Sequence, residues 1–263
     1  MALIHCYECS REISDKAPAC PHCGAPAEEI PHEVLGASGL IVEKGYTKNG
    51  KREGLWEFFS RDGYEEGALM SKGLYSNDEQ CGQWETYYRD GGLKKSLNYK
   101  SGKRHGSYEH YHENGDLEEI RTYEDGKLQG NRERYFEKDD RDEPHGDLDI
   151  SAHYRNGELD GPFESYYETG ELLRRIHYED GLKQGPYQEY IKIGSIFIKG
   201  AFRDDLLHGP YEKRWFSPAH GRLYVKGLYH KGKKCGEWIT YDENSDSETH
   251  RQSHGPCKAE EHA

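Results

Sequence analysis

The sequence has few of the residues that build a membrane span or a large hydrophobic core. Only 33% of its 263 residues are hydrophobic, and only 2 are methionine. No apolar run approaches about 20 residues, so we expect no transmembrane helix. The first residues show no basic stretch followed by an apolar one, so we also expect no secretory signal peptide. These features favour a cytoplasmic protein.

Positive charge is also scarce. The chain carries 36 Lys and Arg against 49 Asp and Glu, a formal net charge of −13. This excess disfavours nucleic acid and anionic lipid as primary partners and favours a basic partner. Neither a phosphate-binding P-loop nor a Gly-x-Ser-x-Gly nucleophile elbow is present, and we expect a protein that is not an enzyme.

A unit of about 24 residues is repeated along most of the chain. A typical copy begins with glycine, any residue, an aromatic residue and then Glu or Gln, followed by further aromatic residues. The eight initial glycines are Gly54, Gly82, Gly106, Gly130, Gly161, Gly185, Gly209 and Gly236. The intervals between them are 28, 24, 24, 31, 24, 24 and 27 residues, which is the regularity of a repeat architecture.

Each repeat predicts one β-hairpin. Two short aromatic-rich runs are separated by turn dipeptides such as Asp90-Gly91 or Asn114-Gly115, and the unit closes with Ser101-Gly102 or Asp125-Gly126. Because type I′ turns need positive φ at both central residues, such dipeptides favour tight hairpins. The connections between hairpins are equally short. We therefore expect an all-β fold, an elongated, twisted antiparallel meander of about eight hairpins over residues 40–242.

Both faces of this sheet should be partly aromatic. Trp84 and Tyr88 point to one face, and Glu85 and Tyr87 point to the other. A Glu recurs beside the first aromatic residue, at Glu57, Glu85, Glu109, Glu133, Glu164 and Glu212. This row could support acid–base catalysis, but a structural row that is solvated or paired with Lys and Arg explains it more simply.

The repeat Gly-x-Trp/Tyr-x-x-Tyr-Tyr, followed by Gly-x-Leu and a later Tyr, resembles the MORN repeat in its bacterial variant form. The resemblance covers Gly54 to Tyr241, with departures at Arg132, Trp215 and Ile239. It implies a MORN-type hairpin sheet. The bacterial variant family is commonly described as an antitoxin component, which implies neutralisation of a toxin or effector. MORN repeats are also linked to phospholipids, which implies a membrane-associated scaffold as the alternative.

Residues 1–27 form a separate module. Cys6, Cys9, Cys20 and Cys23 make two Cys-x2-Cys pairs separated by ten residues. This spacing predicts one structural Zn²⁺ in a closed tetrahedral site, with a pair of disulfides as the alternative. The segment resembles the short zinc ribbon at the start of many bacterial proteins. Zinc ribbons also bind nucleic acid, but this one has few basic residues.

The remaining segments are assigned by composition. Residues 28–39 are expected to be a linker, residues 137–145 a projecting charged loop, and residues 243–263 a disordered acidic tail. Cys81 and Cys235 occupy equivalent repeat positions and suggest a shared structural pocket rather than a redox pair. His110 with His112, and His250 with His254 and Cys257, are possible weak metal ligands but fit surface and tail residues better.

Exposed aromatic side chains of the central repeats are the expected partner-binding surface, because Trp and Tyr are enriched at interface hot spots. The candidates are Trp84, Tyr88, Tyr108, Tyr111, Tyr166, Tyr167 and Tyr187. The partner we expect is another protein, such as a basic toxin or effector. The sequence leaves open the partner's identity, the face it binds and the oligomeric state.

Overall fold

The computed structural model describes residues 3–5, 11–14, 21–22, 30–61, 67–137, 147–216 and 221–257. Every regular element in these ranges is a β-strand. The ranges therefore contain no helix of the length and apolarity that a membrane span requires. The chain divides into two units, residues 1–127 and 128–263. The all-β prediction is confirmed for the described part of the chain.

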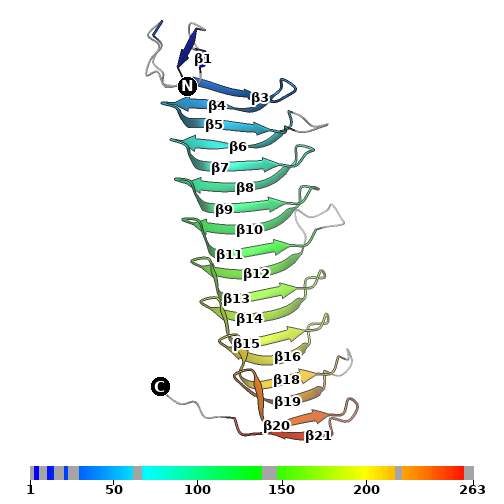
Figure 1. Cartoon of the computed structure of the whole chain (residues 1–263). Coiled ribbons are helices and arrows are strands. Elements are labelled where there is room, and N and C mark those ends of the chain that lie inside the picture. Colours follow the sequence, from blue (N-terminus) through cyan, green and yellow to red (C-terminus); the bar gives the residue numbers. More distant parts are fainter. Residues whose placement is uncertain are drawn as a thin grey trace, which may run out of the picture. The chain divides into compact units, whose positions relative to one another are not determined.

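The described residues of the first unit contain ten strands. They are β1 (Leu3–His5), β2 (Glu12–Ser14), β3 (Ile30–Leu35), β4 (Ile41–Lys48), β5 (Lys51–Phe59), β6 (Leu69–Ser76), β7 (Glu79–Tyr87), β8 (Leu93–Lys100), β9 (Lys103–Tyr111) and β10 (Leu117–Glu124). β1 and β2 pair with each other, whereas β3 to β10 pair antiparallel in chain order. β3 and β10 lie at opposite ends of this sheet, which is an open meander (Figure 1).

The second unit contains eleven strands among its described residues. They are β11 (Lys127–Tyr135), β12 (Leu148–Arg155), β13 (Glu158–Tyr166), β14 (Leu172–Glu179), β15 (Leu182–Tyr190), β16 (Ile196–Arg203), β17 (Leu206–Leu207), β18 (Gly209–Arg214), β19 (Leu223–His230), β20 (Lys233–Tyr241) and β21 (Glu248–His254). They also pair antiparallel in chain order, and β16 pairs with both β17 and β18. β11 and β21 lie at opposite ends of this second meander (Figure 1).

Strands extend beyond both ends of the predicted repeat region. β3 lies within the expected linker and pairs with β4, and β21 lies within the expected disordered tail and pairs with β20. Both expectations were wrong for these strands. The described residues hold nineteen strands from β3 to β21, where eight hairpins would supply sixteen. Backbone pairing with a neighbouring strand orders segments that composition alone assigns to loops.

The two-residue turns lie at different positions from some of those predicted. Consecutive residues with positive φ, as type I′ turns require, occur at the repeat-closing positions, such as Ser101 (48°) with Gly102 (73°) and Asp180 (47°) with Gly181 (82°). At Asp90-Gly91 the turn is wider, and the Tyr88 amide donates to the Gly92 carbonyl oxygen at 2.7 Å. Of these two turn residues only Gly91 has positive φ. The prediction of a two-residue turn at Asp90-Gly91 was therefore wrong.

All eight repeat-initial glycines adopt positive φ, from 62° at Gly82 to 118° at Gly161. At Gly82 the pairing register shifts, because neighbouring Gly73 and Leu74 of β6 oppose Trp84 and Cys81 of β7. Gly82 thus lies in a β-bulge whose left-handed backbone only glycine adopts without strain.

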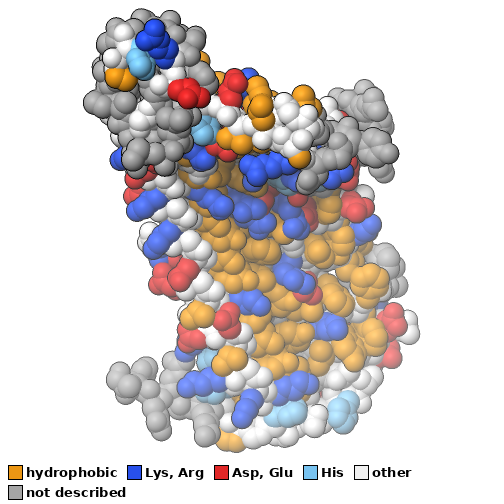
Figure 2. Space-filling view, turned by 45° about the horizontal axis from the view of Figure 1, so that its top comes forward, with side chains coloured by type: hydrophobic (Ala, Val, Ile, Leu, Met, Phe, Trp, Pro, Cys, Tyr) orange, Lys and Arg blue, Asp and Glu red, His pale blue; other side chains and the backbone are white. Residues whose placement is uncertain are grey.

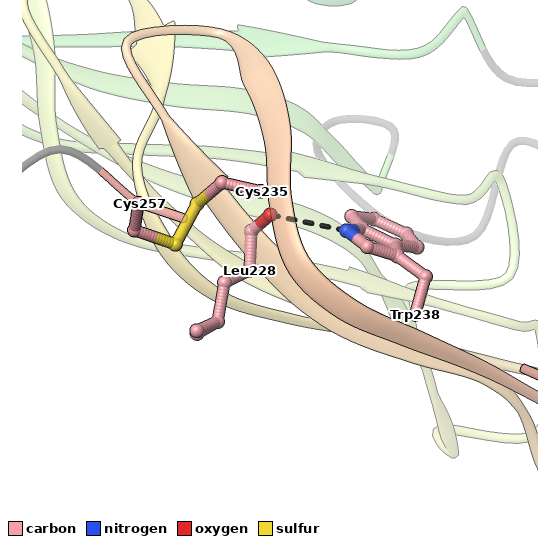
Figure 3. The surroundings of a disulfide bond; sticks show 4 residues. All are labelled: Leu228, Cys235, Trp238 and Cys257. Atoms are coloured by element: carbon pink, nitrogen blue, oxygen red, sulfur yellow. Dashed lines mark hydrogen bonds between the residues drawn. A yellow bond between two sulfur atoms is a disulfide. The ribbon is translucent and has the colours of Figure 1, made fainter. Parts of the chain in front are cut away.

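Aromatic rings cover one face of each unit. In the first unit Tyr75 lies 5.0 Å from Trp84 in an edge-to-face arrangement, and Phe58 lies 6.1 Å from Trp84. In the second unit Tyr229 lies 5.0 Å from Trp238. The indole nitrogens of Trp56, Trp84 and Trp238 each donate to a backbone carbonyl oxygen of the preceding strand, as Trp238 does to Leu228 at 3.2 Å (Figure 3). Such edge-to-face pairs stabilise a single-layer sheet beyond the area they bury.

A candidate binding groove on the first unit

The row of Glu residues lies on the face opposite the packed aromatic rings, and its contacts are structural. Glu85 accepts a hydrogen bond from the Tyr87 hydroxyl at 2.5 Å and pairs with the Lys72 ammonium at 3.0 Å. Hydrogen bonds from the Tyr87 side chain and, to a smaller extent, the Lys72 side chain hold the pKa of the Glu85 carboxyl below its usual value. The Tyr111–Glu109 and Tyr166–Glu164 pairs repeat this contact at 2.6 Å. These carboxylates are therefore occupied in pairs that join neighbouring residues and strands, as the structural interpretation of the row requires.

A hollow of about 440 Å³ opens on the aromatic face of the first unit. Strands β6 to β10 contribute to its walls. Its lining residues are Ser71, Gln80, Trp84, Thr86, Lys95, Leu97, Tyr99, Arg104, Tyr108, Arg121 and Tyr123. We call this hollow the β7–β10 groove. The space-filling view shows hydrophobic side chains gathered over the strands, with Lys and Arg side chains among and beside them (Figure 2).

Aromatic rings form the apolar part of the β7–β10 groove. Trp84 and Tyr99 lie 6.3 Å apart, and Tyr108 and Tyr123 lie 6.2 Å apart, both edge to face. Trp84 and Tyr123 are buried, with 9% and 5% of their surface exposed, whereas Tyr99 and Tyr108 are half-buried. Burial raises the pKa of the Tyr108 hydroxyl. The packed rings hold one another in place and leave part of their surface to the groove.

Three cations lie among these rings. The Arg121 guanidinium stands 4.9 Å from the centre of the Tyr108 ring, and that of Arg104 stands 5.5 Å from the Tyr123 ring. Arg121 also pairs with Glu119, whose side chain is buried and does not line the groove. In the described part of the chain, neither Lys95 nor Arg104 has a carboxylate within 4.0 Å. These two cations are therefore available to a ligand.

The charge of the groove lining is opposite in sign to the net charge of the whole chain. None of its eleven lining residues is acidic, although the chain carries a formal net charge of −13. The Arg121 guanidinium is half-buried over the Tyr108 ring and therefore partly desolvated, which strengthens its electrostatic interactions. Packed rings next to unpaired cations can bind a ligand that is both apolar and negatively charged.

The predicted partner-binding residues are divided between two faces. Trp84 and Tyr108 line the β7–β10 groove, but the Tyr111 and Tyr166 hydroxyls donate to Glu109 and Glu164 on the opposite face. The Tyr88 hydroxyl donates to the Tyr111 carbonyl oxygen at 2.6 Å.

In the second unit the Tyr167 hydroxyl donates to the Tyr190 carbonyl oxygen at 3.0 Å, and the Tyr187 ring lies 5.0 Å from Phe202. Trp84 is buried and the six tyrosines are half-buried, so describing all seven as exposed was wrong. The cations Lys95, Arg104 and Arg121 were missed by sequence reasoning, because only strand register shows which Lys and Arg share a face with the aromatic rings.

The second unit carries a different hollow of about 550 Å³ between β14 and β16. Both acidic and basic side chains line it, including Glu179, Arg203, Asp204 and His208. Burial, ahead of the nearby Arg203 charge, lowers the pKa of His208. With one aromatic lining residue, Phe202, this hollow lacks the packed rings of the β7–β10 groove.

Some of the candidate metal ligands lie in the described residues and others do not. His110 and His112 both face the Glu118 carboxylate, at 2.8 and 3.9 Å from their Nδ1 atoms. Within the described ranges no group of three or more His, Cys, Asp or Glu side chains is arranged to hold a metal ion. The predicted zinc ligands Cys6, Cys9, Cys20 and Cys23 lie outside the described residues.

Cys235 and Cys257 form a disulfide (Figure 3). Cys235 is buried in β20, and Cys257 follows β21. The assignment of Cys257 to a disordered tail was therefore wrong, and Cys235 pairs with Cys257 and not with Cys81. Cys81, at the equivalent repeat position, is a free thiol. A pairing across 22 residues leaves no spacing signature in the sequence.

Three segments of the chain match the MORN repeat variant family, at residues 80–101, 104–125 and 159–180. They include the repeats that begin at Gly82, Gly106 and Gly161, and the first two supply most of the β7–β10 groove. These segments are MORN repeats, as the resemblance implies. No curated protein matches the chain.

Proposed function

We propose that this chain is a non-catalytic binding protein that holds another protein on the aromatic face of its MORN repeats. The β7–β10 groove carries this proposal. It combines Trp, Tyr and Arg, the residue types that dominate protein–protein binding energies, on a rigid antiparallel sheet. The Glu row, the other candidate for chemistry, is occupied in Tyr and Lys contacts.

The partner we propose is a toxin or effector that the chain neutralises by covering its working surface. The family resemblance supports this role, and the acidic net charge of −13 would speed the approach of a basic partner. One structural Zn²⁺, held by Cys6, Cys9, Cys20 and Cys23, would fold the N-terminal ribbon. We place the protein in the cytoplasm, where such thiolates stay reduced.

A pull-down of the tagged chain from its native cells tests this function, with partners identified by mass spectrometry. The experiment is repeated with residues 1–30 deleted. We expect a stoichiometric toxin-like or effector protein that the repeats retain without the ribbon. Loss of the partner on deletion would move its site to the ribbon, and recovery of lipid or nucleic acid without any protein would overturn the proposal.

Membrane association is the second candidate function, because MORN repeats are linked to phospholipids. Against it stands the net charge of −13, which repels an anionic bilayer. Flotation with liposomes of anionic lipid at low salt distinguishes the two functions. We expect the chain to stay in the unbound fraction, and binding to anionic vesicles would favour the membrane scaffold.

A further inference from the structure

We infer that the β7–β10 groove binds an acidic polypeptide segment that carries an aromatic or other large apolar side chain. This inference rests on the proposed function and names the partner chemistry of one site. It departs from the expectation of a basic partner, which follows from the net charge of the whole chain. The groove lining contains basic residues and no acidic ones, and a segment bound in the groove contacts this local surface rather than the average surface of the chain.

Charge complementarity supports an acidic occupant. Lys95 and Arg104 lie on the adjacent strands β8 and β9 and have no carboxylate partner among the described residues. Arg121, on β10, also lines the groove, but its guanidinium is already paired with the buried Glu119 carboxylate. Carboxylates placed beside Lys95 and Arg104 would form charge-assisted hydrogen bonds without displacing an internal salt bridge.

The aromatic lining supports an apolar side chain next to the acidic ones. Trp84 and Tyr99 are 6.3 Å apart, and Tyr108 and Tyr123 are 6.2 Å apart, so the rings hold each other edge to face before a ligand binds. Packing of this kind reduces the conformational entropy that binding would otherwise cost. A volume of about 440 Å³ accommodates a few side chains, not a folded domain.

A short acidic segment fits this site better than an extended anionic surface. Charges separated by more than about 8 Å are largely screened at physiological ionic strength. A peptide in the groove therefore responds mainly to Lys95 and Arg104, the two lining cations without a carboxylate partner among the described residues. A bilayer or a long nucleic acid also meets the remaining surface, where the chain's 49 acidic residues outnumber its 36 basic ones.

The test measures fluorescence anisotropy of labelled nonapeptides with the full-length chain. The probe is GEEFEFEEG, compared with versions in which every Glu is replaced by Gln or by Lys and a version in which both Phe are Ala. We expect the acidic aromatic peptide to bind at least about tenfold more tightly than each of the others, with affinity that falls as salt rises. Equal affinity across the set would overturn the inference.

A matched pair of double variants locates the site. K95Q/R104Q removes two groove cations, and K100Q/K103Q removes two exposed cations from the same strands. Lys100 and Lys103 alternate with the groove residues and so belong to the opposite face. We expect about a tenfold loss of affinity for K95Q/R104Q and less than a twofold loss for K100Q/K103Q.

Equal losses in the two variants would show a general charge effect and overturn the inference. The inference would also be overturned if anionic vesicles or single-stranded oligonucleotides displaced the labelled peptide at lower concentrations than the unlabelled acidic peptide does. As a readout that needs no variant, the indole N–H signal of Trp84 should shift on peptide binding in a nuclear magnetic resonance titration. An unchanged signal at saturation would contradict the groove as the site.

The pull-down separates this inference from the proposed function. If the wild-type chain retains a protein partner and K95Q/R104Q retains it equally, the groove inference fails and the binding function stands. If the wild-type chain retains no protein, the proposed function itself fails. Loss of the partner in K95Q/R104Q but not in K100Q/K103Q supports both.

Discussion

Trp84 lies directly over Gly73 of the neighbouring strand, and a Cβ atom added to Gly73 would stand 2.2 Å from Cδ2 of the indole. The Trp84 indole nitrogen donates to the Leu74 carbonyl oxygen at 3.0 Å, which holds the ring across the glycine. Gly45 and Trp56 repeat the arrangement at 2.4 Å. A tryptophan in this row thus requires a glycine on the preceding strand, because any side chain there would occupy the space of the ring.

The first prediction concerns this contact. Gly73→Ala should lower the free energy of unfolding by about 3 kcal/mol, the upper end of the usual range for overpacking, because the indole has no room to move away. Urea denaturation measures the loss. Gly255→Ala is the matched control, since a Cβ added there meets no atom within 4 Å, and should change stability by less than about 0.5 kcal/mol.

A double-mutant cycle isolates the contact between Gly73 and Trp84. In a Trp84→Leu background the smaller side chain leaves room for a methyl group, so Gly73→Ala should cost less than about 1 kcal/mol. An equal cost in both backgrounds would show that the alanine disturbs the strand itself rather than the ring.

The second prediction concerns the Tyr–Glu contacts. Burial, and then the hydrogen bond to Glu109, raises the pKa of Tyr111 to about 12, and Tyr135 and Tyr166 are raised to about 12 in the same way. A folded-state pKa above the unfolded value of about 10 contributes stability that is complete below pH 10. This contribution is lost as the pH rises through 12.

Ultraviolet absorbance of the phenolate during an alkaline titration measures this behaviour. We expect late titration by these three tyrosines, together with the onset of unfolding. Glu109→Gln should lower the pKa of Tyr111, because the carboxylate charge that opposes ionisation is removed. Glu113→Gln, at an exposed neighbouring position, serves as the control. An unchanged Tyr111 titration in Glu109→Gln would contradict the assigned role of Glu109.

The sequence predicts the hairpin repeats because their signals are local. The spacing of Gly82 and Gly106, and the aromatic residues that follow each, fall directly on β7 and β9. The face alternation of Trp84 and Glu85 also follows from strand geometry alone. Dipeptides such as Asp90-Gly91 were assigned to the wrong turn type, since glycine serves both two-residue turns and wider ones.

The groove and the terminal strands could not be predicted from the sequence. Arg104 faces Tyr123 only because the register pairs Tyr99 with Arg104 and Gly106 with Tyr123. A one-residue shift of that register would move the guanidinium to the other face. β21 has six of its seven residues exposed, so no hydrophobic pattern marks it as a strand. Its place depends on pairing with β20 and on the Cys235–Cys257 disulfide.

The third prediction concerns the N-terminal ribbon. The purified chain should contain one zinc ion, and Cys20→Ser with Cys23→Ser should remove it, because a structural site needs all four thiolates. Metal analysis by mass spectrometry gives the count. Since repeat units pack only on their neighbours, the unfolding curve of the repeats should be unchanged in this variant. Retention of one zinc in the variant would contradict the assigned ligands.

The fourth prediction concerns the Cys235–Cys257 disulfide. Dithiothreitol reduction, or Cys257→Ser, should release β21, because this strand buries little apolar surface and loses a cross-link across 22 residues. Loops of this length contribute about 3 kcal/mol through the unfolded state. Hydrogen exchange should therefore accelerate over Glu248–His254 and remain slow in β19, as expected when units open independently.

Cys81→Ser is the matched control, since this thiol is free and half-buried at the equivalent repeat position. It should leave exchange in β21 unchanged. Unchanged protection of β21 after complete reduction would show that the strand pairing with β20 suffices without the cross-link. Mass spectrometry of the chain alkylated inside its native cells then determines whether the bond forms there. A disulfide is typical of oxidising compartments, whereas the ribbon's zinc ligands require reduced thiolates. Detection of free Cys235 and Cys257 would therefore support the cytoplasmic location, and a fully formed disulfide would contradict it.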